Sequence, residues 1–408
     1  MAISLAKFAR SPSPIAIAPG KSLATLGVAS DGSSLTRKFA NFDSLSMRNL
    51  CMKKIERTRT LKVILPLVLL LAFGLVMVYD ASIAEAQQLF NDKYHFVRLH
   101  AIWILIGLAT VAVSSRIPTA WWQRWSHILF GGSLGLLVLV LLPGLGSQIQ
   151  GAQRWLTIGP VIFQPSELVK LTSVLYLSKW LLKSRPVWNF LGISGFLFFL
   201  MILQPDMGTA IILMATAFFM YYVSGASLKI LGGLGALGIL GVLGLIFISP
   251  YRMRRVTTFL DPTGDLQGSS YHINQILLSL GSGGWMGLGL GRSRQKFQYL
   301  PEATTDSIFA VVGEELGFLG SSILVMIFLT LFWQLTKIVL REQNRGRQLV
   351  AAGLTGWLAF QTVINLAGMV ALMPLTGVPL PFISYGRSSL LAQMISVGIL
   401  LRISLTQK

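Results

Sequence analysis

The chain has 408 residues, of which 53% are apolar and 12% are charged, and its mean hydropathy of +0.67 excludes a water-soluble globular protein. A single cysteine excludes an intrachain disulfide, and the four histidines lack the spacing of a metal site. The formal net charge of +19 does not indicate nucleic-acid binding, because much of the excess lies in the first sixty residues and in short connections rather than in a soluble domain.

Residues 1–60 are basic, rich in serine and poor in acidic residues, and we interpret them as a disordered N-terminal extension. Their composition resembles an organelle transit peptide. It equally fits a cytoplasmic tail or a start codon assigned upstream of Met47 or Met52, and these two interpretations are favoured. The basic residues just before the first apolar run are expected to keep the N-terminus in the cytoplasm, namely Lys53, Lys54, Arg57 and Arg59.

Ten apolar runs follow, each close to the ~20 residues that a helix needs to cross a bilayer. Residues 61–408 are therefore predicted to form an all-α polytopic membrane domain with about ten transmembrane helices. The expected helices cover residues 62–79, 98–114, 126–143, 166–184, 189–204, 206–224, 228–249, 308–336, 348–372 and 383–404. One long extracytoplasmic loop, residues 250–307, is predicted between the seventh and eighth helices.

Basic residues gather in the even-numbered connections between the expected helices, and by the positive-inside rule these connections face the cytoplasm. Both termini are then cytoplasmic, and the loop 250–307 lies outside. The segment Gln204–Thr209 leaves two arrangements open, because it separates two apolar runs with almost no connection. A tight outward hairpin keeps this topology. A single broken helix would place the loop 250–307 in the cytoplasm, which the basic connection 337–347 opposes.

The loop 250–307 is the longest hydrophilic segment between apolar runs, and it holds six basic side chains. Asp306 stands where this loop re-enters the membrane, and it has two explanations. It caps the following helix, or it acts as a general base on a hydroxyl while nearby cations stabilise anionic oxygens. The substrate-binding candidates in the loop are Arg254, Arg255, Lys296 and Glu302.

A second polar set lies around Arg154, Glu167 and Lys170. Glu167 and Lys170 are three residues apart and share one face of a helix. They form either an internal ion pair, which neutralises two charges that are costly in lipid, or a cation offered to an anionic substrate. Arg98, at the start of the second expected helix, also has two explanations. It is a cation offered to an anionic substrate, or it extends its charged end to the membrane–water interface, where an arginine needs no partner.

A third set of polar residues lies near the end of the ninth expected helix and in the segment after it. The segment 374–381 is rich in proline and glycine, which predicts a fixed re-entrant loop near the outer surface. Asn365 precedes this segment, and Arg387, Ser388 and Ser389 follow it. These polar side chains line a cavity in one interpretation and only support the loop in the other.

Several of these motifs together resemble the SEDS family (shape, elongation, division and sporulation) of peptidoglycan polymerases. The resemblance covers about residues 60 to 405, and it is closer to the division branch, FtsW, than to the elongation branch, RodA. The motifs that carry it are GAQRW at 151–155, QPSELVKL at 164–171, LQPDMGT at 203–209, RQKF at 294–297, YLPEATTD at 299–306, GEELG at 313–317 and GVPLPFISYG at 377–386.

The resemblance implies a glycosyltransferase that polymerises lipid II into glycan strands during cell division. The essential aspartate of the family falls on Asp306, which would take the proton of the acceptor sugar hydroxyl. The family's basic residues fall on Arg98 and Lys170, which would meet the pyrophosphate. Two positions depart from the family's pattern: Thr304 stands where histidine is usual, and Arg387 stands where glycine is usual.

The resemblance also implies the setting of the reaction. The chain would be a multi-pass protein of the bacterial inner membrane, at the division septum, with a class B penicillin-binding protein and other division proteins as partners. No cofactor or metal ligand is assigned, and a divalent cation requirement is left open. Two alternatives remain, a flippase for lipid II and a non-catalytic scaffold for division proteins.

Overall fold

The computed structural model describes residues 32–142, 146–149, 152–158, 161–183, 186–261, 264–265, 268, 270–297 and 299–407. The chain divides into two compact units, Met1–Lys54 and Ile55–Lys408. Residues 1–31 of the predicted N-terminal extension lie outside the described residues, and the boundary at residue 60 stays a prediction. The second unit carries every candidate site residue.

Seven described helices are long and apolar enough to cross a membrane. They are α1 (Gly32–Phe90, in which Thr58–Phe90 is the candidate span), α2 (His95–Ser114), α3 (Thr119–Leu141), α7 (Leu228–Ile248), α10 (Ile308–Arg341), α11 (Arg345–Met369) and α12 (Arg387–Leu405). Two shorter apolar helices are α5 (Val187–Leu203) and α6 (Met207–Val223). With α4 (Pro165–Trp180), each of the ten predicted spans corresponds to one helix, so the predicted fold class is confirmed.

The helix α4 is shorter and more polar than the others, yet nearly all of its side chains are buried. It packs against α3, α6, α11 and α12, which shield it from the lipid. This central position explains how a helix with Glu167 and Lys170 is tolerated within the membrane, because charged side chains there face the bundle interior and pair with one another.

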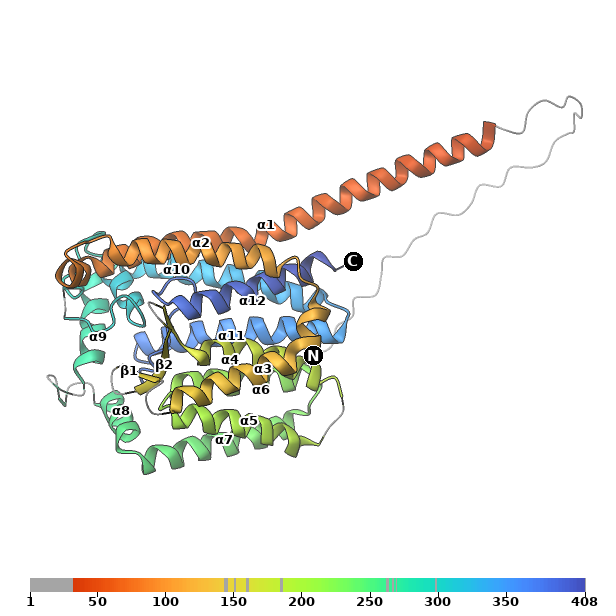
Figure 1. The fold of residues 1–408 in the computed structure, drawn as a ribbon. Coiled ribbons are helices and arrows are strands. Elements are labelled where there is room, and N and C mark those ends of the chain that lie inside the picture. Colours follow the sequence, from red (N-terminus) through yellow and green to blue (C-terminus); the bar gives the residue numbers. More distant parts are fainter. Residues whose placement is uncertain are drawn as a thin grey trace, which may run out of the picture. The chain divides into compact units, whose positions relative to one another are not determined.

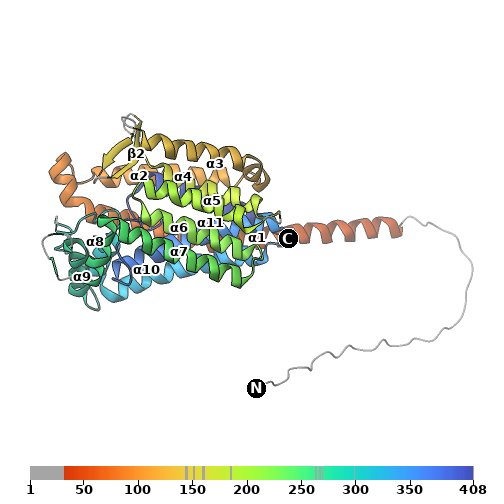
Figure 2. The ribbon, with the colours of Figure 1, turned by 90° about the horizontal axis from the view of Figure 1, so that it is seen from below.

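The predicted loop 250–307 contains two helices, α8 (Pro250–Leu260) and α9 (Tyr271–Gly283). A small antiparallel sheet, which the sequence analysis did not predict, lies between α3 and α4, with strands β1 (Gly146–Ile149), β2 (Ala152–Ile158) and β3 (Val161–Phe163) in the order β1-β2-β3. The sheet, α8 and α9 lie at one end of the helical bundle, and α12 ends at the opposite end (Figures 1 and 2).

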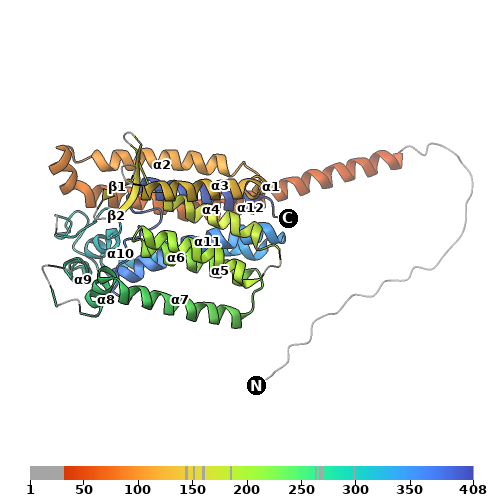
Figure 3. The ribbon, with the colours of Figure 1, turned by 60° about the horizontal axis from the view of Figure 1, so that its bottom comes forward.

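The helices α5 and α6 form a tight antiparallel hairpin around Pro205. The ring of Phe190, near the start of α5, stacks on Tyr221, near the end of α6, with 4.4 Å between the ring centroids. The two helices lie side by side in Figure 3. The alternative of a single broken helix is therefore wrong, and the segments after residue 207 keep the predicted alternation across the membrane.

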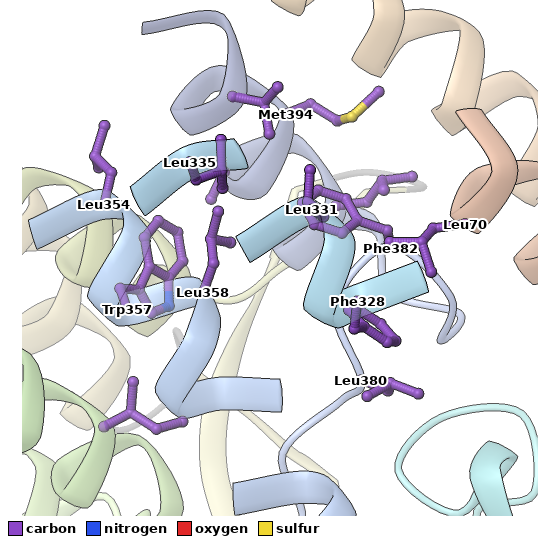
Figure 4. Close-up of a cluster of buried hydrophobic side chains, with 14 of the residues drawn as sticks. Leu70, Phe328, Leu331, Leu335, Leu354, Trp357, Leu358, Leu380, Phe382 and Met394 are labelled. Atoms are coloured by element: carbon purple, nitrogen blue, oxygen red, sulfur yellow. The ribbon is translucent and has the colours of Figure 1, made fainter. Parts of the chain in front are cut away.

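The core of the bundle holds the frame on which the site is built. Trp357 of α11, Phe328 of α10 and Met394 of α12 are buried in one hydrophobic cluster with Phe382, which lies in the segment between α11 and α12 (Figure 4). Burying an aromatic or long apolar side chain contributes about 1.5–3 kcal/mol. The segment 370–386 is thus fixed by its own apolar side chains although it has no regular secondary structure.

Candidate functional site

A polar cleft of about 420 Å³ opens at the end of the bundle that carries the sheet. We call it the Asp306 cleft. Its walls come from β2, the start of α4, the turn before α10 and the segment between α11 and α12. Its polar lining residues include Arg154, Gln164, Glu167, Asp206, Thr209, Arg255, His272, Glu302, Thr305, Asp306, Tyr385, Arg387, Ser388 and Ser389.

Asp306 lies in the turn that precedes α10, and its side chain is half-buried in the wall of the cleft. Ser307, not Asp306, occupies the N-cap position of α10, so the explanation of Asp306 as the helix cap does not hold. Asn365 holds the turn in place, because its Nδ2 donates to the carbonyl oxygens of Asp306 at 2.9 Å and of Val378 at 2.8 Å.

Thr305 lies between two carboxylates. Its hydroxyl oxygen is 2.6 Å from Oε2 of Glu302 and 2.8 Å from Oδ1 of Asp306. A hydroxyl has one proton and can donate to one of them at a time. Burial and, after it, the negative charge of Glu302 together raise the pKa of Asp306 to about 6. A carboxylate with a pKa near the working pH suits a general base.

Three arginines line the same cleft, and the backbone fixes two of them. Nε of Arg154 donates to the carbonyl oxygen of Gln204 at 2.9 Å. Nη1 of Arg255 donates to the carbonyl oxygen of Leu375 at 2.7 Å. Arg387, which replaces the family's glycine, lies over the ring of Tyr385, with 6.0 Å between its guanidinium carbon and the ring centroid. The replacement therefore adds a cation to the cleft wall.

The other two acids of the cleft, Glu167 and Asp206, each accept a hydrogen bond from a nearby residue. Oε1 of Glu167 accepts a hydrogen bond from Nζ of Lys170 at 2.8 Å, and Gln361 accepts another from the same ammonium group at 2.8 Å. Asp206 caps α6, because its Oδ1 accepts from the N–H of Thr209 at 3.1 Å. These hydrogen bonds of Glu167 and Asp206 do not involve the three arginines of the cleft.

Ser388 and Ser389 lie in the first turn of α12, and Ser388 connects this turn to the residue before α4. Oγ of Ser388 accepts a hydrogen bond from the N–H of Gln164 at 3.0 Å, and Oγ of Ser389 accepts one from Nε2 of Gln393 at 2.7 Å. Both serines line the cleft, as the sequence analysis allowed. Their hydrogen bonds also support the loop, so both interpretations of this set describe part of their role.

Four predicted substrate-binding residues lie outside the cleft lining. Arg98 is exposed and pairs with Asp92. Lys170 is buried beneath Glu167, and it reaches the cleft only through that carboxylate. Arg254 lines a neighbouring cavity of about 610 Å³, which shares Arg255 and His272 with the Asp306 cleft.

Lys296 is the fourth of these residues. It is buried away from the cleft, where its ammonium group is 2.8 Å from a carboxylate oxygen of Asp80 and 2.8 Å from one of Glu315. This ammonium group neutralises two acids inside the protein and is not available to a ligand in this arrangement. A role in substrate binding for Arg98, Lys170, Arg254 or Lys296 stays a prediction.

His272 is a site residue that the sequence analysis missed. It lies on α9, and its Nε2 is 2.8 Å from Oγ of Ser307, directly after Asp306. Burial lowers the pKa of His272 to about 4, so the ring is neutral near pH 7. A lone histidine in a polar helix gives no sequence signal, because only folding brings α9 against the turn that carries Asp306.

Among the described residues, no group of three or more His, Cys, Asp or Glu side chains is arranged to hold a metal ion. The sequence analysis assigned no metal ligand, and the question of a divalent cation stays open.

The fold and the cleft define a multi-pass membrane protein with a carboxylate and arginines in a cleft at one end of its bundle. The sequence model of the family FTSW_RODA_SPOVE, described as cell cycle protein, matches residues 60–408. The chain therefore belongs to the FtsW/RodA/SpoVE family.

Individual relatives agree with this assignment. Stage V sporulation protein E of Bacillus subtilis is 38% identical over 344 residues, which cover 82% of this chain and 94% of that protein. The probable peptidoglycan glycosyltransferase FtsW of Nitrosomonas europaea is 39% identical over 348 residues, which cover 82% and 90%.

Solved structures share the fold. A chain from a structure reported as "Structural coordination of polymerization and crosslinking by a peptidoglycan synthase complex" has a TM-score of 0.70 and 29% identity, with 85% of this chain and 98% of that chain covered. The crystal structure of the rod shape determining protein RodA of Thermus thermophilus has a TM-score of 0.62 and 27% identity, with 84% and 96% covered.

Proposed function

We propose that this protein is a peptidoglycan glycosyltransferase that polymerises lipid II into glycan strands during cell division, with Asp306 as the general base. The relatives named as probable peptidoglycan glycosyltransferases support the reaction class. The observation that carries the proposal is the carboxylate of Asp306, with its raised pKa, in a cleft lined by three arginines. An anionic lipid-linked donor needs cations, and its acceptor needs a base.

The proposed chemistry is a displacement at the anomeric carbon of the donor sugar. The acceptor hydroxyl oxygen forms the new bond to this carbon, and its proton passes to Oδ2 or Oδ1 of Asp306. The bond between the anomeric carbon and the diphosphate breaks, and the electron pair leaves with the lipid diphosphate. Arg154, Arg255 and Arg387 stabilise the charge that develops on the leaving oxygens, because they are already fixed around the cleft.

The proposed setting follows from the same reasoning. The cleft faces the outside of the inner membrane, both termini lie in the cytoplasm, and the protein acts at the division septum. A class B penicillin-binding protein would crosslink the new strands. The similarity to a chain of a peptidoglycan synthase complex supports a partner of this kind.

Substitution of Asp306 tests the proposed reaction. The Asp306→Asn variant keeps the size of the side chain and removes the base, so we expect glycan synthesis from lipid II to fall at least ~10²-fold, the typical share of general-base catalysis. Glycan length is measured with purified protein and its partner. Asp92→Asn, which alters a carboxylate outside the cleft, is the matched control and should retain activity.

Two outcomes would contradict the proposal. Normal polymerisation by the Asp306→Asn variant would remove Asp306 from the catalytic role. Movement of lipid II across vesicle membranes by the wild-type protein, with no growth of glycan under conditions where the partner is present, would favour the flippase alternative. Membrane insertion and elution as a single species must be the same for all variants.

A further inference from the structure

A second polar cavity is lined by residues near the ends of α10 and α12. These helices end on the side of the bundle opposite the sheet (Figure 1). The cavity measures about 60 Å³, and it is formed by side chains of α1 and α10 together with Gln407 near the C-terminus. We call it the basic pocket and define it by the four cations that line it, Arg59, Lys62, Lys337 and Arg341.

The charge of the basic pocket is unbalanced. Among the residues that the structure describes, no carboxylate lines the pocket, and none of the ion pairs involves its four cations. Glu56 stands three residues before Arg59 in the sequence, and even with this acid the cations are in excess by four to one. Like charges gathered around one cavity repel each other, so an anion bound among them lowers the energy of the arrangement.

Topology and helix geometry explain why cations occur at this end of the bundle, but not why four of them line one cavity. Lys337 and Arg341 lie in the last turns of α10, where cations complement the negative end of the helix dipole. Lys337 also lies over the ring of Trp333, 5.0 Å from its centroid. Arg59 and Lys62 lie within α1, not at its C-terminus, and the positive-inside rule does not require them to face the cations of another helix.

The surroundings of the basic pocket indicate the nature of the anion. Large apolar side chains beside it are exposed on the same two helices: Leu65 by 62%, Trp333 by 61% and Leu340 by 75%. In a membrane such side chains are covered by acyl chains, and Trp is typical of the membrane–water interface. The basic pocket therefore lies where a lipid headgroup meets the protein surface.

We propose that the basic pocket binds the phosphate of an anionic phospholipid in the leaflet on that side of the membrane. A water molecule occupies roughly 30 Å³ in the liquid, so a cavity of about 60 Å³ has room for a compact group such as a phosphate and not for a peptide segment. The acyl chains would follow the exposed apolar surfaces of α1 and α10. Basic pockets between membrane helices are known to bind acidic lipid headgroups. This proposal does not depend on the reaction at Asp306.

Lipid binding by the purified full chain tests the proposal. In a neutral detergent, native mass spectrometry counts the bound lipid after addition of phosphatidylglycerol or phosphatidylcholine. We expect retention of phosphatidylglycerol to exceed that of phosphatidylcholine, because the choline cation would face four positive side chains. The variant Lys62→Gln with Arg341→Gln should bind phosphatidylglycerol roughly thirtyfold more weakly, since each of the two cations near a lipid surface contributes a similar, additive share of about fivefold.

A matched control separates the basic pocket from the general charge of the surface. Arg116→Gln with Arg124→Gln removes the same charge from exposed positions in and after the predicted cytoplasmic connection between α2 and α3. This control should bind as the wild type does. An equal loss in both double variants, or equal retention of the two lipids, would overturn the proposal.

Two further measurements keep the test decisive. Lys62 and Arg341 are exposed, so their replacement should leave folding intact, and the single variant Lys62→Gln provides an intermediate loss if the double variant is poorly expressed. Millimolar inorganic phosphate should not displace the bound lipid. Displacement by phosphate alone would show a site for a free anion and would contradict the assignment to a lipid.

Discussion

The hydroxyl of Thr305 lies between the carboxylates of Glu302 and Asp306, so both Thr305 and Glu302 act on the pKa of Asp306. When Glu302 is negative, its charge disfavours a second negative charge on Asp306, while a hydrogen bond from Thr305 favours it. The two neighbours therefore act on the pKa of Asp306 in opposite directions. Substitutions of Glu302 and of Thr305 are therefore expected to shift the pKa of Asp306 in opposite directions.

The pH dependence of glycan synthesis should follow the ionisation of Asp306. Because a base must be deprotonated to accept a proton, the rate should fall as the pH decreases through about 6. In Glu302→Gln the like charge is lost, so the pKa of Asp306 falls. The fall of the rate on the acid side of the pH profile, the acid limb, then moves to lower pH. Initial rates measured from about pH 5 to about pH 8 give the limb directly.

Thr305→Val is the opposing variant for this titration. Removal of the hydroxyl withdraws a hydrogen bond from the carboxylate, so the pKa of Asp306 should rise and the acid limb should move to higher pH. Thr305→Ser keeps the hydroxyl and should behave as the wild type. If the limb stays at one pH in all of these variants, a group other than Asp306 controls the rate.

At the residue scale, the sequence predicted where Asp306 lies better than it predicted which residues the basic side chains contact. A carboxylate at the junction of a polar loop and an apolar helix can lie only near the membrane surface, and this restricts its place. A long basic side chain can pair in many directions. Arg98 pairs with Asp92, and Lys296 pairs with Asp80, which is 216 residues away in the sequence. Nothing in the local sequence indicates these partners.

At the scale of the elements, the apolar runs predicted ten helices because each one must satisfy its own backbone in lipid. The same reasoning could not find α8, α9 or the three strands, which lie outside the apolar runs and are short. The sheet contributes directly to the site, since β2 carries Arg154 into the Asp306 cleft.

Lys296 joins the segment before Asp306 to α1 and α10, and its loss should destabilise the whole domain. Lys296→Met leaves the carboxylates of Asp80 and Glu315 buried without their cation, which costs about 3–5 kcal/mol for a broken buried pair. Thermal unfolding of the purified protein, followed by its loss from the monodisperse fraction, measures the effect. Lys93→Met, at an exposed lysine, is the control. Equal thermal stability of the two variants would show that the buried cluster is not structurally important.

At the scale of the whole molecule, α10 connects the Asp306 cleft to the basic pocket. The turn with Asp306 precedes its first residue, and Arg341 of the basic pocket is its last. Gly317 interrupts α10 with a non-helical backbone conformation (φ 66°, ψ −165°). Residues 318–341 alone are about 36 Å long at ~1.5 Å per residue, which still exceeds the ~30 Å of the hydrocarbon core. The Asp306 cleft and the basic pocket should therefore lie on opposite sides of the membrane.

Cysteine labelling tests this arrangement. In a Cys51→Ser background, a cysteine at the exposed position Tyr299 should react with a membrane-impermeant maleimide in intact spheroplasts. A cysteine at the exposed position Gln343, between α10 and α11, should react only after lysis, because the positive-inside rule places this basic connection in the cytoplasm. The opposite pattern would place Asp306 in the cytosol. Polymerisation on the outer surface would then be impossible, and the pocket at the other end of α10 would face the outer leaflet.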